Sequence, residues 1–216
     1  MEINICNNKN IHLIGIQDEY RNRISDSIKK GLEMASSILK YSSSVEVVVF
    51  DSEDWDVHKK LNLSAHARIY YIDIKICFYR KGLDFNHLFN VDIPATIYHE
   101  LAHVVRVNSV GYAENLLQDI IDEGIACYIE KFSKLGPSQP YINPIDGEDK
   151  YFNEARKHFK ERLDYNLHSR WFYGSADLPE WIGYRLGYLM VNKFMEGNKV
   201  GIDELVRLRA EVIANL

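Results

Sequence analysis

The stretch PATIYHELAHVVRV, residues 94–107, decides the fold of this chain. Pro94 suits the first turn of a helix, because its fixed φ angle is helical and a first-turn N–H has no partner inside the helix. Asp92, just before it, complements the positive end of the helix dipole. The apolar residues that follow recur at helical spacing. We therefore expect one helix over about 94–107.

This predicted helix carries an HExxH motif, formed by His99, Glu100 and His103. Four residues make about one turn of helix, so both imidazoles project from one face and can reach a single tetrahedral metal ion. Glu100 is displaced toward the open coordination position, where it can take a proton from water and pass it to a leaving group. The alternative is an amphipathic helix with incidental histidines, but structural histidines rarely bracket a glutamate in this way. The motif predicts a metal centre with Glu100 as its general base.

The residues before this helix predict a small sheet and one helix. Asp18–Lys40 has apolar residues every three or four positions, which predicts an amphipathic helix. Val45–Phe50 is short and rich in β-branched residues, as is typical of a buried strand. Arg68–Tyr79 alternates apolar and polar residues, which predicts a half-solvated strand at a sheet edge. Asp51–Ser64 is polar and mixed, so we expect a loop or a short helix there.

The second half of the chain predicts mainly helices. Glu114–Phe132 repeats apolar residues at helical spacing over its whole length. Gly136–Gly147 holds three of the five prolines and is therefore expected to be a loop. Further helices are expected over about 148–164, 179–196 and 202–214. A small sheet followed by many helices predicts an α+β fold.

Length and composition fit a single globular domain. We expect residues 1–216 to form one domain, with an α/β part over about 1–92 and a mainly helical part over about 93–216. With 46% hydrophobic and 26% charged residues, the chain is neither disordered nor fibrous. The net charge of −5 offers no basic surface for nucleic acid, so we expect no nucleic-acid partner.

We expect a cytoplasmic protein. No apolar run approaches the roughly 18 residues of a membrane span, and the first residues, MEINICNNKNIHLIGI, lack the pattern of a secretory signal. Cys6, Cys77 and Cys127 are odd in number, widely spaced and without a CxxC pair. They are therefore expected to be reduced thiols, and not a disulfide framework or a zinc cluster.

A catalytic zinc site needs a third protein ligand beside two histidines. Glu123 lies twenty residues after His103, on a predicted helix that can pack antiparallel to the HExxH helix. Gly124 and Ala126 are small, so the backbone beside Glu123 can approach a neighbouring element closely. The alternative is that Glu123 is a solvated carboxylate at a helix edge. Other candidate ligands are His58, His66, His158 and His168.

Three runs of the sequence resemble known metallopeptidases. They are HELAHVVR at 99–106, NLLQDIIDEGIACYIE at 115–130 and LPEWIGYRLGYLMV at 178–191. An HExxH motif followed by a glutamate in a Glu-Gly-Ile-Ala helix resembles the gluzincin class of zinc metallopeptidases. Over roughly residues 65–195, the chain more closely resembles DUF2268, a bacterial family of predicted zinc-dependent proteases that includes YjaZ-like proteins.

The resemblance implies a zincin-like fold, a zinc cofactor and a peptide or protein substrate. It also implies that His99, His103 and Glu123 bind the zinc ion and that Glu100 is the base. We therefore expect zinc-dependent hydrolysis of peptide bonds. The alternative is a zinc-binding but catalytically silent regulatory or protein-binding module on the same scaffold, although such a module has little reason to keep a base between its ligands.

The chain departs from the gluzincin pattern at Cys127. Gluzincins commonly carry an aspartate four residues after the ligand glutamate, where it orients a ligand histidine. Because a thiol is a poor substitute for a carboxylate, either Asp119 or Asp122 supports the histidine or zinc binds less tightly. Cys127 could itself bind zinc, but a small buried thiol is the commoner fate of such a residue.

Peptide hydrolysis also needs a group that stabilises the oxyanion. Our first choice is Tyr184 and our second is His168, and further candidates are Tyr173 and Arg185. The alternative is that Tyr184 packs its helix into the core, the usual fate of aromatic residues at helical spacing. We expect Arg106 to be a buried salt-bridge partner that holds two helices together, rather than a clamp for a substrate carboxylate.

Overall fold

The structure is a computed structural model that describes residues 10–53, 61–135 and 140–215. These residues fall into two compact units, which we describe separately. The first consists of residues 1–105 with 133–136, and the second of residues 106–132 with 137–216. The expected single domain over residues 1–216 stays a prediction. A small sheet and many helices make the fold class α+β, as predicted.

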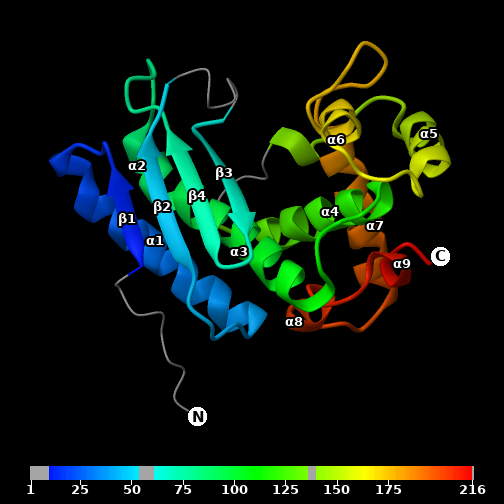
Figure 1. Cartoon of the computed structure of the whole chain (residues 1–216), viewed down its shortest axis with the longest axis horizontal. Helices are drawn as coiled ribbons and strands as arrows, with labels where there is room; N and C mark the ends of the chain where they lie inside the picture. Colours follow the sequence, from blue (N-terminus) through cyan, green and yellow to red (C-terminus); the bar gives the residue numbers. More distant parts are fainter. Residues whose placement is uncertain (1–9, 54–60, 136–139, 216) are drawn as a thin grey trace. The chain divides into compact units, whose positions relative to one another are not determined.

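The first unit contains a four-stranded sheet (Figure 1). Its strand order is β1-β2-β4-β3, in which β1, β2 and β4 are parallel and β3 is antiparallel to β4. The strands are β1 Ile11–Ile14, β2 Glu46–Asp51, β3 Leu63–Arg68 and β4 Tyr71–Ile76. In Figure 1 the helix α1, Asp18–Leu39, runs along one face of this sheet.

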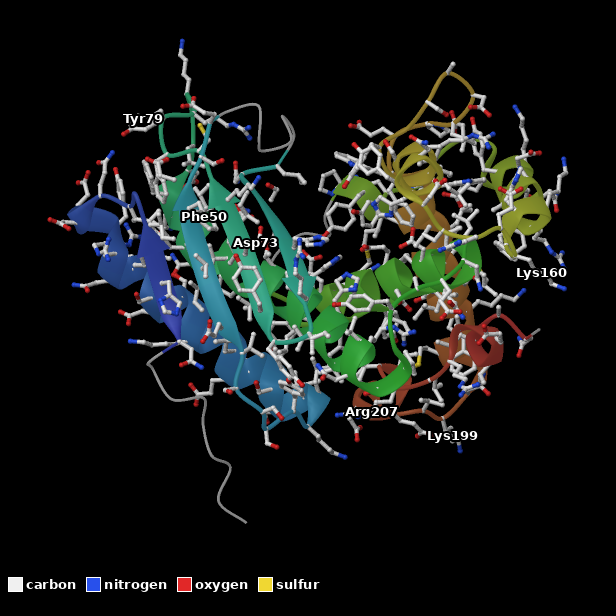
Figure 2. The ribbon with its side chains drawn as sticks, in the orientation of Figure 1. Phe50, Asp73, Tyr79, Lys160, Lys199 and Arg207 are labelled. Atoms are coloured by element: carbon white, nitrogen blue, oxygen red, sulfur yellow. The ribbon has the colours of Figure 1, made fainter. Side chains whose placement is uncertain are left out.

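The sheet has one buried face and one half-exposed face. On β4 the isoleucines Ile72, Ile74 and Ile76 are fully buried, while the residues between them are only half-buried. Figure 2 labels Phe50 of β2 and Asp73 of β4, which the strand register places together on the half-exposed face. The alternation of apolar and polar residues in the sequence of β4 therefore reflects a sheet that is covered on one side.

Two expectations for the strands were wrong. The strand predicted over Arg68–Tyr79 is shorter, and it lies inside the sheet between β2 and β3 instead of at an edge. Apolar and polar residues alternate along this strand because one face of the sheet is buried and the other is half-exposed. An interior strand of such a sheet shows the same alternation as an edge strand. The true edge strand, β3, begins in a segment predicted to be a loop or short helix, of which residues 54–60 lie outside the described residues.

The helix predicted over Asp18–Lys40 is confirmed as α1. It buries the expected apolar stripe and ends at Lys40, whose φ of 49° is left-handed. Gly31 allows the close approach of α1 to the next long helix, α3 (Ile93–Val110), because an added Cβ there would lie 2.9 Å from Cβ of Ile97.

The HExxH helix expected over about 94–107 is confirmed as α3, Ile93–Val110, and a shorter helical stretch directly precedes it. The helical run comprises α2 Phe85–His87, the π-helical segment Leu88–Asp92 and α3 Ile93–Val110. Asp84 caps this run by accepting hydrogen bonds from two backbone N–H groups, whereas Asp92 is buried and accepts one from Asn62 at 2.7 Å. Pro94 cannot make an α-helical hydrogen bond to the carbonyl four residues earlier. The wider π turn directly before it accommodates this interruption.

In the second unit, two long helices cross with their backbones in contact. They are α4 Leu116–Phe132, predicted over Glu114–Phe132, and α7 Ile182–Gly197, predicted over about 179–196. A Cβ added to Gly187 would lie 2.0 Å from the carbonyl oxygen of Ile120, and one added to Gly124 would lie 2.2 Å from the carbonyl carbon of Gly187. Gly124 therefore allows a close approach of α4 to α7.

The remaining helices are shorter than predicted. The one expected over about 148–164 ends at His158, and a separate helix follows after Asp164, whose side chain accepts a hydrogen bond from the N–H of Leu167 at 2.8 Å. The Gly136–Gly147 segment contains one 3-10 turn in its described part. These elements are α5 Glu148–His158, α6 Tyr165–Phe172, α8 Ile202–Leu205, α9 Ala210–Ile213 and the turn Pro140–Ile142. No helix in the described ranges is long and apolar enough to cross a membrane.

Arg106 is the buried salt-bridge partner that the sequence predicts. It is 1% exposed, and its Nε donates to Oδ1 of Asp122 on α4 at 2.8 Å. Its Nη1 donates to the carbonyl oxygens of Val206 at 3.2 Å and Leu208 at 3.0 Å. The last turns of α3 are thereby joined to α4 and to residues 206–208 within the second unit.

We expect Arg106→Met to lower the free energy of unfolding by about 2 kcal/mol, since it leaves a carboxylate and two carbonyls without their donor. The loss is below that of a fully buried pair because the Asp122 side chain is 14% exposed. Urea denaturation measures it. The matched control is Arg207→Met, on the exposed Arg207 labelled in Figure 2, which should change stability by less than about 0.5 kcal/mol. Equal effects of the two substitutions would contradict the role given to Arg106.

Candidate metal centre

Two imidazoles face each other on α3. His99 and His103 lie one turn apart in the helix, and their Nε2 atoms are 3.2 Å from one another. In a tetrahedral zinc site with Zn–N bonds of about 2.0–2.1 Å, two ligand nitrogens lie about 3.3 Å apart. The spacing of the two rings therefore suits a shared tetrahedral metal ion.

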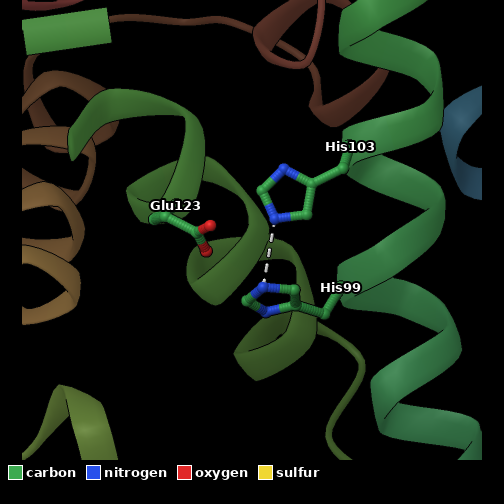
Figure 3. Close-up of side chains that lie close together, drawn as sticks. All are labelled: His99, His103 and Glu123. Carbon is green, nitrogen blue, oxygen red and sulfur yellow. Dashed lines mark hydrogen bonds between the residues drawn. The ribbon is translucent and has the colours of Figure 1, made fainter. Parts of the chain in front are cut away.

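Glu123 of α4 completes a group of three ligand-type side chains. One ligand atom from each of His99, His103 and Glu123 lies within 4.8 Å of the others. Figure 3 shows the three labelled side chains close together. Among the described residues, these three side chains could hold a metal ion.

Glu100 follows the first histidine on the same helix and is 6% exposed. A carboxylate so withdrawn from water is costly unless a positive charge or hydrogen bonds stabilise it. A cation between the two histidines would be such a charge, and the carboxylate beside it could accept a proton from an attacking water. The arrangement can therefore support acid–base chemistry next to a metal ion.

A further histidine, His168 of α6, is paired with an aspartate on the same helix as Glu123. Nδ1 of His168 is 2.8 Å from Oδ2 of Asp119, and the His168 ring stacks on Phe172 with 4.6 Å between ring centroids. Burial alone would lower the pKa of His168, but the hydrogen bond to Asp119 and the charges of Asp119 and Glu123 outweigh it and raise the pKa. The negative charge of Glu123 therefore acts on His168.

The charge of Glu123 also affects the pKa of Tyr173, at the end of α6. Partial burial of its hydroxyl is the larger cause that raises its pKa, and the neighbouring carboxylate of Glu123 raises it further. The Tyr173 side chain is nevertheless 56% exposed. Its ring meets the edge of His168 with centroids 5.5 Å apart. Tyr173 and His168 thus form one cluster beside Glu123.

The other two candidates for oxyanion stabilisation, Tyr184 and Arg185, contact neighbouring side chains and backbone. Tyr184 meets the rings of Phe172 and Tyr141 at centroid distances of 4.9 and 5.1 Å. Arg185 donates to Glu148 at 2.6 Å and to the carbonyl oxygen of Ile142 at 2.8 Å. The role of Tyr184 stays a prediction, while Arg185 joins the start of α5 to α7.

The two carboxylates that could support a ligand histidine each have a partner outside the candidate ligands. Asp122 binds Arg106, and Asp119 binds His168. Cys127 is 1% exposed and packs in an apolar cluster with Ile142 and Tyr188, in agreement with a small buried thiol. Its exclusion from the group of candidate ligands within the described chain agrees with this interpretation.

The alternative third ligands that the structure describes are not part of this group. His158 contacts Glu161 at 2.7 Å and Glu154 at 3.2 Å on the surface of α5. His66 lies on β3, and His58 lies outside the described residues. The sequence did not reveal that Asp119 would bind His168. The available signal was that Asp119 and Glu123 are four residues apart, and hence on one face of α4.

Comparison with known proteins identifies a family for the chain. The family described as "Predicted Zn-dependent protease (DUF2268)" matches residues 24–215. The "Uncharacterized protein YjaZ" of Bacillus subtilis (strain 168) is 23% identical over 175 residues, which are 77% of this chain. The matched region spans 65% of the length of that protein. No solved structure matches the chain.

Proposed function

The chain belongs to the DUF2268 family of predicted Zn-dependent proteases, and we propose that it hydrolyses peptide bonds with a zinc ion held by His99, His103 and Glu123. The convergence of these three side chains is the observation that supports the proposal most strongly. With its HExxH helix and a ligand from a following helix, the arrangement would be zincin-like and of gluzincin type. Its substrate would be a peptide or a protein.

The donor set fits zinc. Two imidazoles and one carboxylate are a common ligand set of catalytic zinc and leave a fourth position open. Calcium and magnesium prefer ligand sets made of oxygen atoms alone. When bound, zinc would polarise the scissile carbonyl and lower the pKa of water.

Glu100 is the proposed proton carrier. It takes a proton from the attacking water, whose oxygen forms a bond to the carbonyl carbon of the substrate. The carbon–nitrogen bond then breaks, and Glu100 delivers the same proton to the departing amine nitrogen. The position of Glu100, directly after the proposed ligand His99 on α3, supports this role.

The test combines a metal assay with a cleavage assay. We expect the purified protein to contain one zinc ion per chain and to cleave fluorescently labelled casein or members of a peptide library. His99→Ala and His103→Ala should lose both zinc and cleavage. Sub-stoichiometric zinc that is unchanged in both variants would remove the metal site from the proposal.

We expect Glu123→Gln to weaken zinc binding by at least about 100-fold, since loss of a ligand should exceed the 10–100-fold cost of losing a supporting residue. Chelator competition measures the affinity. The matched control is Glu130→Gln on the same helix. Glu130 is 7% exposed and accepts a hydrogen bond from the hydroxyl of Tyr141, which a glutamine oxygen can also accept. Equal small losses in both variants would mean that Glu123 is not a ligand.

A further inference from the structure

The carboxyl ends of β2 and β4 border a cavity within the first unit. The two strands are parallel neighbours, and Asp51 at the end of β2 is paired in register with Ile76 at the end of β4. The cavity has a volume of about 450 Å³, within the range of about 300–1,000 Å³ that is typical of pockets for small molecules. In open sheets of parallel strands, ligands bind outside the carboxyl ends of the strands. The place and the size of the cavity therefore fit a small ligand.

The cavity has an acidic wall and a basic wall. The acidic wall comprises residues 51–53, at the end of β2, and includes Asp51 and Glu53. The basic wall comprises residues 77–81, which follow β4, and includes Arg80 and Lys81. Since neighbouring strands lie only about 4.8 Å apart, charges of both signs border one small space.

Backbone hydrogen bonds hold both walls in place. The N–H of Ser52 donates to the carbonyl oxygen of Ile76 at 2.9 Å, which joins the acidic wall to the end of β4. The N–H of Arg80 donates to the carbonyl oxygen of Cys77 at 3.2 Å, which closes a turn in the basic wall. The cavity is therefore bordered by backbone that is already ordered without a ligand.

Asp51 points most directly to a ligand. The residue is half-buried, and its Oδ1 atom is withdrawn from solvent and accepts no hydrogen bond from the described residues. A carboxylate oxygen that is removed from water without a donor costs free energy, and most buried polar atoms in native proteins have a partner. Rotation about the Cβ–Cγ bond exchanges the two carboxylate oxygens, so a donor in the cavity can reach either of them. Asp51 is therefore an acceptor for a positively charged donor.

The balance of charge selects the class of ligand. A phosphate group would be attracted by Arg80 and Lys81 but repelled by Asp51 and Glu53, and a polyamine would meet the converse. A zwitterion presents an ammonium group to the acidic wall and a carboxylate to the basic wall, so both walls gain a charged hydrogen-bonding partner. Glu53 and Lys81 are exposed and form no ion pair with the described residues, so the ligand has no partner of theirs to displace.

The rest of the lining offers apolar surface. Cys77 is 4% exposed, while Tyr79, labelled in Figure 2, is 75% exposed. A thiol and an aromatic ring can contact an apolar side chain of the ligand. We propose that this cavity binds a free α-amino acid, whose ammonium group is bound by Asp51 and whose carboxylate is bound by Arg80 and Lys81. The cavity shares no residue with the proposed zinc site, so this inference does not depend on the proposed function.

The experiment begins with a screen of the standard L-amino acids, one at a time, on the full chain. Each is added at about 10 mM, which nearly saturates a site with a Kd of about 1 mM, and the Tm is measured. We expect at least one amino acid to raise the Tm. Titration calorimetry then compares it with its N-acetyl derivative, which lacks the ammonium group, and its amide, which lacks the carboxylate. Each derivative should bind at least about tenfold more weakly, the loss expected for one hydrogen bond between charged groups.

Two variants locate the two charged groups of the ligand. Asp51→Asn keeps the size of the side chain and removes its charge, so it should weaken the amino acid at least about tenfold but leave the N-acetyl derivative unchanged. Lys81→Met should weaken the amino acid but leave the amide unchanged, because an interaction that is already absent cannot be lost again. Glu46→Gln is the matched control and should change no affinity, since Glu46 is an exposed residue at the opposite end of β2.

Several results would overturn the proposal. The first is that no amino acid raises the Tm. The second is binding that Asp51→Asn and Lys81→Met both leave unchanged, because the amino acid then lies elsewhere. The third is equal affinity for the amino acid and its two derivatives, since the charges would then not select the ligand. Tighter binding of 5′-AMP than of every amino acid would identify a nucleotide site instead. Neither zinc content nor cleavage enters these measurements, so they leave the proposed function to its own test.

Discussion

We expect Glu100→Gln to lower the cleavage of labelled casein by about 10³-fold, within the range that a positioned general base contributes. Glutamine has nearly the same shape as glutamate but cannot accept the proton of the attacking water. The side chain is 6% exposed, so water does not readily replace it as a base. Zinc affinity, measured by chelator competition, should stay within a few-fold of wild type, since Glu100 is not one of the three proposed ligands.

Glu33→Gln is the matched control, because Glu33 is an exposed residue of α1, and it should retain full activity. A Glu100→Gln variant that cleaves as fast as wild type would exclude Glu100 as the base. A wild-type protein that binds stoichiometric zinc but cleaves no member of a broad peptide library would instead favour the catalytically silent module.

Gly187→Ala should lower the free energy of unfolding by at least about 3 kcal/mol, the upper end of the usual cost of overpacking. The new methyl group would lie 2.0 Å from the carbonyl oxygen of Ile120 and 2.9 Å from backbone atoms of Gly124. Because these neighbours are backbone, no side-chain rotation relieves the collision, and α4 and α7 must move apart. Urea denaturation followed by circular dichroism measures the loss.

Gly197→Ala provides a control on the same helix. An added Cβ at Gly197 meets no atom within 4 Å, so alanine should leave stability unchanged or raise it by up to about 1 kcal/mol. If Gly187→Ala is as stable as Gly197→Ala, the two helices do not touch through their backbones. A Gly187→Ala variant that gives no soluble protein while Gly197→Ala does would agree with the prediction.

The long helices could be predicted because each buries one regular stripe. In α1, Ile24, Ile28 and Leu32 recur at helical spacing and are all buried. The short strands could not be predicted in the same way. Leu63–Arg68, which reads LSAHAR, has small and polar residues and becomes a strand only because β4 supplies its hydrogen-bonding partner. Such a strand depends on tertiary context, which local propensity does not record.

The parts of the candidate site could be predicted from the sequence to different extents. His99 and His103 could be paired from spacing alone, because a helix brings residues four apart to one face. Glu123 required the resemblance to a family, since nothing in α4 by itself distinguishes it from the other acidic residues. The pairing of Asp119 with His168 depends on where α6 lies after a chain reversal, and no local pattern encodes that.

The hydrogen bonds of Arg106 have a consequence for the order of assembly during synthesis. Its two carbonyl acceptors belong to residues 100 and 102 positions further along the chain. Closing so long a segment carries a large entropic cost and delays the contact. The ribosome must therefore have released residues 206–208 before the end of the histidine-bearing helix is fully anchored. A nascent chain shorter than this would lack part of the hydrogen bonding that anchors the last turn of α3 within the second unit.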